Sequence, residues 1–446
     1  MKRLLIFILL VVVLLVALRY LPPLVIGDFE TKPTDMLSEL FEEQDTVSES
    51  VPTVVDSAQQ TAKADSVIQN MPTGMTPIED FGQQTAHGMQ AFWNMLDQVG
   101  SLNRPVRIAY IGDSFIEGDI ITNDLRILLQ KRFGGAGAGF VDMASDFVKY
   151  RLPVDQTFNG WDAFAGINPK SVDWQKMTLN MRYAIPKTGA ATATFYDGRG
   201  KCDTVENAVL YLRSNSPLSI SVCQNKGEAI QQTTSGTGQI ESLVTTGRTG
   251  CISYTFGGSA VGNGTVVYGM SFENPRGIVL DNISLRGTGG NIIASVPVEN
   301  LRQFNAVRPY DLIILQFGLN VAEKKRTNYD SYIAQMKQVV TNLQEGFPQA
   351  SIMIVSVGDR ENKINGTLQT LPGIKALVQA QRGLAQQTNV AFWNMYEGMG
   401  GEGSMQRMVE ANPSEANKDY THINRRGGKR IADIIYKTLM YFYENK

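Results

Sequence analysis

Apolar residues are spaced in two different ways along this chain, and the change of spacing constrains the fold more than any other feature. Before residue 149 and after residue 275, apolar strand-like runs alternate with amphipathic helical stretches, a pattern typical of a parallel sheet with right-handed crossovers. Between these points apolar residues recur at every second position in short segments, which indicates antiparallel strands. We therefore expect an α/β domain, residues 77–148 and 276–446, interrupted by an inserted β-sandwich at 149–275.

The individual elements follow from the same periodicities. In the α/β part, strands are predicted at 106–111, 311–317, 351–357 and 390–392, and helices at 81–96, 123–132, 332–343, 374–385 and 427–443. In the insert, period-two strands are predicted at 177–183, 218–222 and 252–256. The glycine-rich segment 133–140 (FGGAGAGF) lacks the Lys-Ser/Thr ending of a phosphate-binding loop, so it is predicted to be an ordinary loop.

The amino terminus predicts a membrane-targeting segment. Lys2 and Arg3 precede an unbroken apolar run from Leu4 to Leu18, which would form a helix about 22 Å long against a hydrocarbon core of about 30 Å. A signal peptide and a signal anchor both fit, and the lack of a clear small-x-small cleavage site favours an anchor over residues 4–21. The two positive charges predict that the rest of the chain lies outside the cytoplasm, in the periplasm or cell envelope.

This segment is expected to occupy residues 1–27. Residues 28–76 are acidic, rich in Ser, Thr and Pro, and without a sustained apolar period. Such a composition buries too little apolar surface to fold alone. We therefore expect a flexible linker between the membrane segment and the folded part.

Charge and the rarer residue types exclude several kinds of site. The chain has 446 residues with 41 Lys and Arg against 43 Asp and Glu, so no basic surface for nucleic acid is expected. Its three cysteines, Cys202, Cys223 and Cys251, do not form a disulfide framework, and pairing within the chain would leave at least one thiol free. Its two histidines, His87 and His422, are too few for a multi-histidine metal site.

The strand at 106–111 leads into Gly112, Asp113 and Ser114. These are common turn-forming residues, so a turn is one sufficient explanation. The other is a serine nucleophile at the carboxyl end of a strand, where α/β folds place their sites. The rest of the chain has to distinguish the two.

A serine nucleophile needs a base to take its proton and a group that orients the base. His87 lies in a helical stretch and is expected to be a surface or packing residue. His422 follows the last strand, and Asp419 precedes it by three residues. In a tight loop this spacing lets the carboxylate reach one imidazole nitrogen while the other faces Ser114, although an Asp-x-x-His segment also fits an ordinary helix-capping loop.

A developing oxyanion needs hydrogen-bond donors. Gly318-Leu319-Asn320 follows directly on the strand at 311–317, where a glycine can present its backbone N–H and an asparagine its side-chain amide. A second glycine cluster, from Gly287 to Gly290, ends the strand-like segment 277–286. Each cluster alone also fits a turn.

Taken in order, four blocks of this chain resemble the GDSL, or SGNH, hydrolase family: Gly112-Asp113-Ser114, Gly287, Gly318-Leu319-Asn320 and Asp419-Tyr420-Thr421-His422. The resemblance covers about residues 77–148 and 276–446. It implies a flavodoxin-like three-layer α/β fold with a parallel sheet.

The resemblance also implies a role for each matching residue. Ser114 would be the nucleophile, His422 the base, and Asp419 the group that orients His422. The oxyanion hole would consist of the Ser114 N–H, the Gly287 N–H and the Asn320 side chain, with the N–H of Gly289 as the alternative to that of Gly287.

Longer segments are similar to the bacterial peptidoglycan O-acetylesterase branch of that family, at 112–140, 277–290 and 392–405. Members of this branch carry a carbohydrate-binding-module-like β-sandwich between the Ser and Gly blocks. The branch also includes glycan O-acetyltransferases that work with a membrane acyl-donor protein. This chain differs from its relatives at three positions, Phe115, Arg286 and Val321, which bear on substrate preference more than on the triad.

Three functions are compatible with these features. The first is an esterase that removes O-acetyl groups from a cell-envelope glycan through an acetyl-serine, and the set of residue types favours it. The second is a membrane-anchored glycan O-acetyltransferase with a membrane acyltransferase partner, which the expected anchor favours. The third is a non-catalytic glycan-binding protein that works through its β insert. The proposed chemistry requires no metal or organic cofactor.

Overall fold

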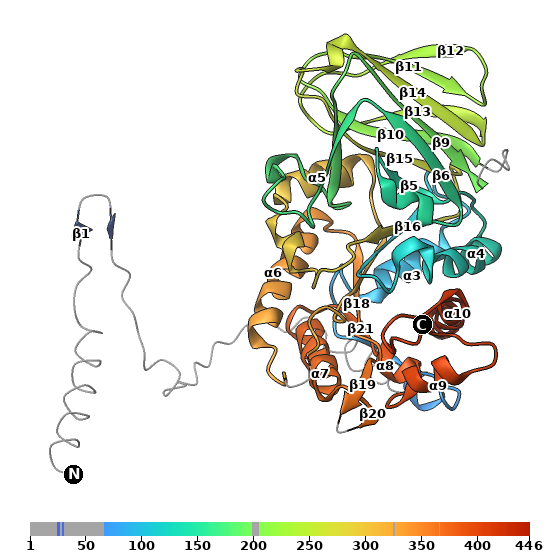
Figure 1. The fold of residues 1–446 in the computed structure, drawn as a ribbon, viewed down its shortest axis with the longest axis vertical. Helices are drawn as coiled ribbons and strands as arrows, with labels where there is room; N and C mark the ends of the chain where they lie inside the picture. Colours follow the sequence, from blue (N-terminus) through green and yellow to red (C-terminus); the bar gives the residue numbers. More distant parts are fainter. Residues whose placement is uncertain (1–24, 27–28, 31–66, 199–204, 324–325, 365) are drawn as a thin grey trace, which may run out of the picture. The chain divides into compact units, whose positions relative to one another are not determined.

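The computed structural model describes residues 25–26, 29–30, 67–198, 205–323, 326–364 and 366–446 (Figure 1). The expected anchor at 4–21 and most of the expected linker lie outside these residues. In the amino-terminal unit, Met1–Lys63, β1 (Val25–Ile26) pairs antiparallel with β2 (Phe29–Glu30). Over the described ranges, no helix combines the length and apolarity needed to cross a bilayer. The second unit spans Ala64–Lys446.

A six-stranded sheet forms the centre of the α/β part, and five of its strands are parallel. Its order is β16 (Ile278–Ser284), β4 (Val106–Gly112), β17 (Leu312–Gln316), β18 (Ser351–Val355), β21 (Ala391–Trp393) and the antiparallel edge strand β3 (Ile78–Asp80). Every residue of β4, β17 and β18 is buried, as in parallel sheets covered on both faces. Along the chain the parallel strands follow the order 2-1-3-4-5 of flavodoxin-like sheets. The prediction of an α/β fold with a parallel sheet is confirmed.

Helices cover both faces of this sheet (Figure 1). One layer contains α3 (Met89–Asp97), α4 (Thr122–Phe133) and α10 (Arg425–Glu444), and the other contains α5 (Val298–Val307), α6 (Asp330–Gly346) and α7 (Pro372–Gln387). Shorter elements complete the part: α8 (Met395–Gly398), α9 (Ser404–Glu410), the hairpin β19 (Glu361–Ile364) and β20 (Thr367–Thr370), and the 3₁₀ turns η2 (Glu117–Asp119) and η7 (Asn291–Ser295).

The helix predicted at 81–96 begins eight residues later than expected, at Met89. The carboxylate of Asp80 accepts the backbone N–H groups of Gly82 and Met89 at 3.0 and 2.8 Å, and so folds the intervening residues into turns. Gly82 and Gly88 touch, because a Cβ on Gly88 would lie 2.1 Å from the carbonyl oxygen of Gly82. The apolar period of this segment did not reveal that contact.

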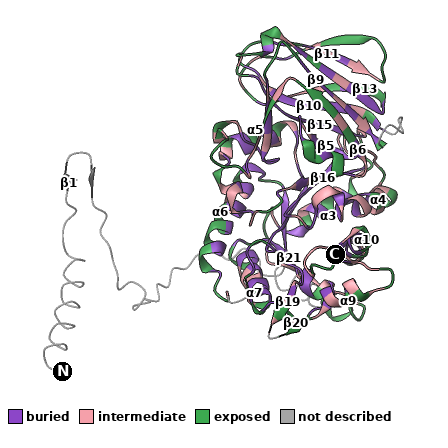
Figure 2. Ribbon diagram, in the orientation of Figure 1, coloured by how far each residue is buried: buried purple, intermediate pink, exposed green. Residues whose placement is uncertain are grey.

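Two antiparallel sheets are inserted between β4 and β16, and we call them the sandwich. The first contains β13 (Glu241–Thr249), β10 (Val205–Arg213), β15 (Val266–Glu273), β8 (Arg182–Pro186) and β7 (Trp161–Ala165), with β5 (Gly139–Asp142) also paired to β15. The second contains β12 (Ala229–Thr233), β11 (Ser219–Gln224), β14 (Cys251–Gly257), β9 (Ala190–Asp197) and β6 (Val154–Asn159). Short 3₁₀ turns lie at η3 (Asp146–Tyr150), η4 (Trp174–Lys176) and η6 (Gly258–Ala260). Alternate residues of both sheets form one buried core (Figure 2).

Two of the predicted insert strands are confirmed, as β11 and β14, but the strand predicted at 177–183 is wrong over most of its length. Met177, Leu179 and Met181 are buried, yet β8 begins only at Arg182. The side chain of Asn180 accepts from the hydroxyl of Thr178 at 2.6 Å and donates to the carbonyl of Tyr268 at 3.3 Å. The backbone N–H of Met181 bonds within the segment, to the Thr178 carbonyl at 3.0 Å, as in a turn and not in a strand ladder.

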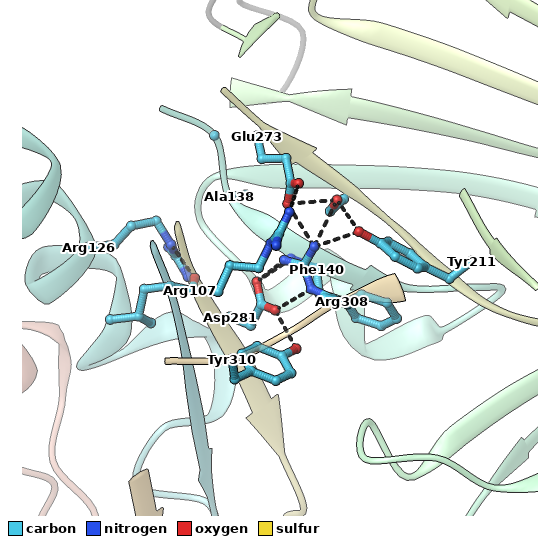
Figure 3. Close-up of polar contacts among 12 residues, drawn as sticks. Arg107, Arg126, Ala138, Phe140, Tyr211, Glu273, Asp281, Arg308 and Tyr310 are labelled. Carbon is cyan, nitrogen blue, oxygen red and sulfur yellow. Dashed lines mark hydrogen bonds and ion pairs between the residues drawn. The ribbon is translucent and has the colours of Figure 1, made fainter. Parts of the chain in front are cut away.

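A buried ion-pair cluster joins the sandwich to the central sheet (Figure 3). Arg308, at the end of α5, donates to Asp281 of β16 at 2.8 Å and to Glu273 of β15 at 2.7 Å. Arg107 of β4 donates to the same Glu273 at 2.6 Å. Burial alone would raise the pKa of Glu273, but the two arginines lower it to about 2. The cluster therefore fastens the sandwich to the two strands that lead into the candidate site.

Candidate active site

The carboxyl ends of β16, β4 and β17 lie side by side, at the point where the strand order of a doubly wound sheet reverses. The carbonyl of Gly112 accepts the N–H of Leu285 at 2.7 Å, and the N–H of Asp113 donates to Gln316 at 3.2 Å. A Cβ on Gly112 would lie 2.8 Å from the Gln316 carbonyl oxygen. Glycine at this position thus allows the ends of β4 and β17 to meet.

Ser114 follows β4 in a segment that we call the Ser114 loop, residues 113–117. Its Oγ lies 3.0 Å from Nε2 of His422, and Nδ1 of His422 lies 2.8 Å from a carboxylate oxygen of Asp419. A proton on Nδ1, next to the carboxylate, leaves Nε2 to accept the serine proton. The structure brings these three residues together in the order that the sequence suggested, and their catalytic roles stay a prediction.

Asp419 and His422 lie in a tight segment, residues 417–424, that we call the His422 loop. One carboxylate oxygen of Asp419 accepts the N–H groups of Thr421 and His422, both at 3.0 Å. Burial acts to raise the pKa of Asp419, but these N–H groups and the His422 ring hold it below its ordinary value. Helix α10 is capped by Asn424, whose side chain accepts from Arg426 at 2.9 Å. The helix-capping explanation therefore does not apply to Asp419.

Candidate oxyanion donors face the same strand ends. Asn320 follows β17 and donates from Nδ2 to the Thr288 carbonyl at 3.0 Å, which brings it against the turn that contains Gly287. An asparagine amide has a second hydrogen. Gly287 has a φ of +79°, with open space where a Cβ would be. Within the described part of the chain, the backbone N–H groups of Ser114, Gly287 and Gly289 donate to no protein acceptor, so both oxyanion alternatives from the sequence stay open.

Asp113 organises the site in a way that sequence reasoning missed. Its side chain is 2% exposed and accepts the N–H groups of Phe115 at 3.0 Å and of Leu319 at 3.3 Å. It therefore ties the Ser114 loop to the loop that carries Asn320. Burial raises the pKa of Asp113 to about 6, against the hydrogen bonds that lower it. The one signal in the sequence was that Asp113 stands between Gly112 and Ser114 in the first of the four blocks.

Two further contacts around the site join residues that are distant in sequence. Glu117 pairs with Arg286 at 2.7 Å, next to Gly287. Arg360 donates to the carbonyl of Leu319 at 2.8 Å, while the N–H of the following residue, Glu361, donates to the carbonyl of Tyr420 at 3.0 Å. Residues 360–361 thus connect the Asn320 segment to the His422 loop.

The three positions that differ from the resembled branch have different surroundings. Phe115 is buried, and a Cβ on Gly358 would lie 3.4 Å from its ring, so its ring lines the core and not the open site. Val321 is buried beside Gly289. Arg286 is exposed and paired with Glu117, which places it at the rim.

Solved structures include one that superposes well on this chain. No protein-family model and no curated protein matches the sequence. A solved structure described as "Peptidoglycan O-acetylesterase in action, 5 min" superposes with a TM-score of 0.67 at 22% identity, over 83% of this chain and 99% of that one. A family two carbohydrate esterase from Clostridium thermocellum in complex with cellohexaose covers 66% of this chain and 100% of its own, at 9% identity and a TM-score of 0.28, too low to support an argument. The first of these matches shows that the chain shares the fold of that structure, as the resemblance of its four sequence blocks predicted.

Proposed function

We propose that this protein is a serine esterase that removes O-acetyl groups from a cell-envelope carbohydrate, peptidoglycan or another glycan. The observation that carries the proposal is the chain of contacts from Ser114 through His422 to Asp419. It lies at the switch point of a sheet whose fold is shared with a peptidoglycan O-acetylesterase.

In the first half of the reaction, Oγ of Ser114 attacks the acetyl carbonyl carbon while Nε2 of His422 takes its proton. The negative charge on the carbonyl oxygen is stabilised by the Ser114 and Gly287 N–H groups and the Asn320 amide. His422 then gives its proton to the sugar oxygen as the carbon–oxygen ester bond breaks. The sugar leaves with a free hydroxyl, and the acetyl group stays on Ser114.

In the second half, His422 takes a proton from water, which attacks the acetyl-serine. The bond to Oγ breaks, the proton returns to Ser114, and acetate leaves. Asp419 holds the imidazole in the required tautomer and stabilises its charged form throughout. No step requires a metal or an organic cofactor.

A glycan O-acetyltransferase is the second candidate, because the expected anchor at residues 4–21 would keep the protein beside a membrane acyl donor. In that reaction a sugar hydroxyl replaces water in the second half. An extracytoplasmic location and a membrane acyltransferase partner belong to this proposal. The two candidates use the same residues and differ in which acceptor reaches the acetyl-serine faster.

The test is acetate release by the full chain from p-nitrophenyl acetate and from O-acetylated peptidoglycan, with Ser114→Ala and His422→Ala beside the wild type. His87→Gln is the matched control, because His87 is the other histidine and its Nδ1 lies 2.9 Å from the Ala350 carbonyl oxygen, not from a residue of the candidate site. Release that vanishes in the first two variants and persists in the control supports the esterase. Release that is unaffected by Ser114→Ala contradicts it. A sugar acceptor that diverts acetyl groups from water favours transfer.

A further inference from the structure

A small polar cavity of about 30 Å³ lies between the Ser114 loop and the sandwich. Its walls come from both sides, and the residues that matter are Glu117 and Ser284 from the α/β part and Asp142, Ser145, Phe147 and Arg182 from the insert. A cavity of this size holds one or two water molecules or a hydroxyl group.

The cavity adjoins the residues on either side of the candidate nucleophile. The N–H of Glu117 donates to the carbonyl of Ser114 at 3.3 Å, and the hydroxyl of Ser284 donates to the carbonyl of Asp113 at 3.4 Å. The carboxylate of Glu117 also holds Arg286, the neighbour of Gly287. A group bound in this cavity therefore sits next to the Ser114 loop and to the turn of a candidate oxyanion donor.

One wall of the cavity carries a buried polar group without a partner. Ser145 is 8% exposed, and over the described residues its hydroxyl has no hydrogen-bond partner. Its backbone N–H, in contrast, donates to the side chain of Gln156 at 3.0 Å. Because an unsatisfied buried hydroxyl costs stability, its presence at this wall points to a ligand group that satisfies it.

One residue that lines the cavity is aromatic. Phe147, on η3, is 39% exposed. The guanidinium of Arg182 lies 4.8 Å over the Phe147 ring, and its Nε lies 3.2 Å from Asp142. An exposed aromatic ring is thus held next to donors and acceptors.

The charges of the walls select a neutral ligand. Two carboxylates, of Glu117 and Asp142, and two guanidinium groups, of Arg151 and Arg182, line the cavity. Its charges therefore balance and favour neither an anion nor a cation. A hydroxyl can both donate and accept, and the aliphatic face of a sugar ring packs well on an exposed aromatic side chain.

We propose that this cavity is a subsite for a neutral sugar residue of the glycan, with one sugar hydroxyl bonded to Ser145 and Arg182 and the ring against Phe147. The assignment rests on the proposed function, because it places that sugar beside the ester.

The kinetic test compares a substrate that fills the subsite with one that does not reach it. In the full chain, Ser145→Ala and Phe147→Ala should each lower kcat/KM for an O-acetylated neutral oligosaccharide by about tenfold, with p-nitrophenyl acetate turnover within about twofold of wild type. Phe158→Ala is the matched control, a 37% exposed aromatic on β6, and should leave both unchanged. Ser145→Ala should keep or raise the melting temperature, since it removes a buried hydroxyl without a partner.

Equal losses on both substrates would show a structural role and overturn the subsite. No loss on either substrate would show a cavity that holds water alone and would overturn the subsite as well.

A binding measurement separates failure of the subsite from failure of the proposed function. In the Ser114→Ala background, an N-acetylglucosamine oligomer should bind, binding should weaken with Phe147→Ala, and it should persist with Phe158→Ala. Tighter binding of an oligogalacturonate than of the neutral oligomer would contradict the neutral assignment.

If the wild type releases no acetate but the neutral oligomer binds in this Phe147-dependent way, the esterase fails and the subsite stands. If acetate release depends on Ser114 but the oligomer does not bind, the esterase stands and the subsite fails.

Discussion

The carboxylate of Asp113 accepts the backbone N–H of Leu319 at 3.3 Å, so one buried side chain joins the end of β4 to the end of β17. Ser114 lies immediately after the first residue and Asn320 immediately after the second. The distance between candidate nucleophile and candidate oxyanion donor is therefore set by a contact that neither of them makes.

Replacement of Asp113 by Asn should uncouple these two segments. The Asn side chain keeps one acceptor oxygen and turns an NH₂ toward the other backbone N–H. We expect acetate release to fall about 10- to 100-fold in kcat with a smaller change in KM, because an oxyanion donor would be displaced. Steady-state kinetics on p-nitrophenyl acetate measures this, and an unchanged kcat would show that Asp113 does not position Asn320.

The same residue predicts a pH dependence of stability. Burial raises the pKa of Asp113 from 3.8 to about 6 in the folded protein, so the folded state binds more protons than the unfolded state between these values. Stability should therefore fall as pH rises from about 4 to about 6, and the cost should stay constant above that range. Urea unfolding of wild type and Asp113→Asn at several pH values tests this, and parallel profiles would contradict it.

Much of the α/β part could be predicted from sequence because its signals are local. The strand at 106–111 and the helix at 332–343 are apolar patterns within one element, and they appear as β4 and α6 with ends shifted by a few residues. Asp419 and His422 are also local, since three residues separate them. Their meeting with Ser114 depends on the order of strands, which the resemblance supplied.

The features that sequence reasoning missed depend on specific side-chain contacts, some across a turn and some between distant segments. The delayed start of α3 depends on Asp80 accepting from Met89 across a turn. The pair Glu117 and Arg286 is separated by 169 positions. The hydroxyl of Ser145 lies in a cavity wall shared with Arg182 and Ser284, which are distant in sequence. None of these leaves a periodic trace in the amino-acid sequence.

Asp419→Asn should impair catalysis more than it impairs folding. The Asn side chain favours the wrong imidazole tautomer, and the corresponding change in the triad of a serine protease lowers kcat by about 10⁴-fold. Because Asp419 is about half exposed, we expect a loss of about 10²- to 10⁴-fold. The melting temperature at neutral pH should change little. A loss below about tenfold would show that another group orients His422.

The lowered pKa of Asp419 also predicts behaviour in acid. A carboxyl whose folded pKa lies below 3.8 stabilises the folded state above that value, and the contribution is lost as pH falls through the folded pKa. The solvent-exposed position makes this contribution small. The difference in unfolding free energy between wild type and Asp419→Asn should therefore shrink in acid, and a difference that grows would contradict the lowered pKa.

The buried cluster between sandwich and sheet predicts that replacing Arg308 lowers the free energy of unfolding much more than replacing Arg302. Arg308→Met leaves Glu273 and Asp281 buried without their partner, which should cost about 3–5 kcal/mol in urea unfolding. Arg302→Met, on the same helix, removes an exposed pair with Glu345 at 3.2 Å and should cost less than about 1 kcal/mol. Equal costs for the two variants would show that the cluster does not fasten the sandwich.

Two glycines of the site should respond to the same substitution for different reasons. Gly112→Ala places a Cβ 2.8 Å from the Gln316 carbonyl oxygen. The ends of β4 and β17 must then separate, and acetate release should be lost together with stability.

The Cβ of Gly287→Ala meets no atom within 4 Å, but the φ of +79° at this position is unfavourable for alanine, at a cost of about 1–2 kcal/mol. This variant should fold, which makes it the cleaner test of the oxyanion assignment. If the Gly287 N–H binds the oxyanion, a shift of this strained turn should lower kcat, whereas full activity would transfer the role to the N–H of Gly289.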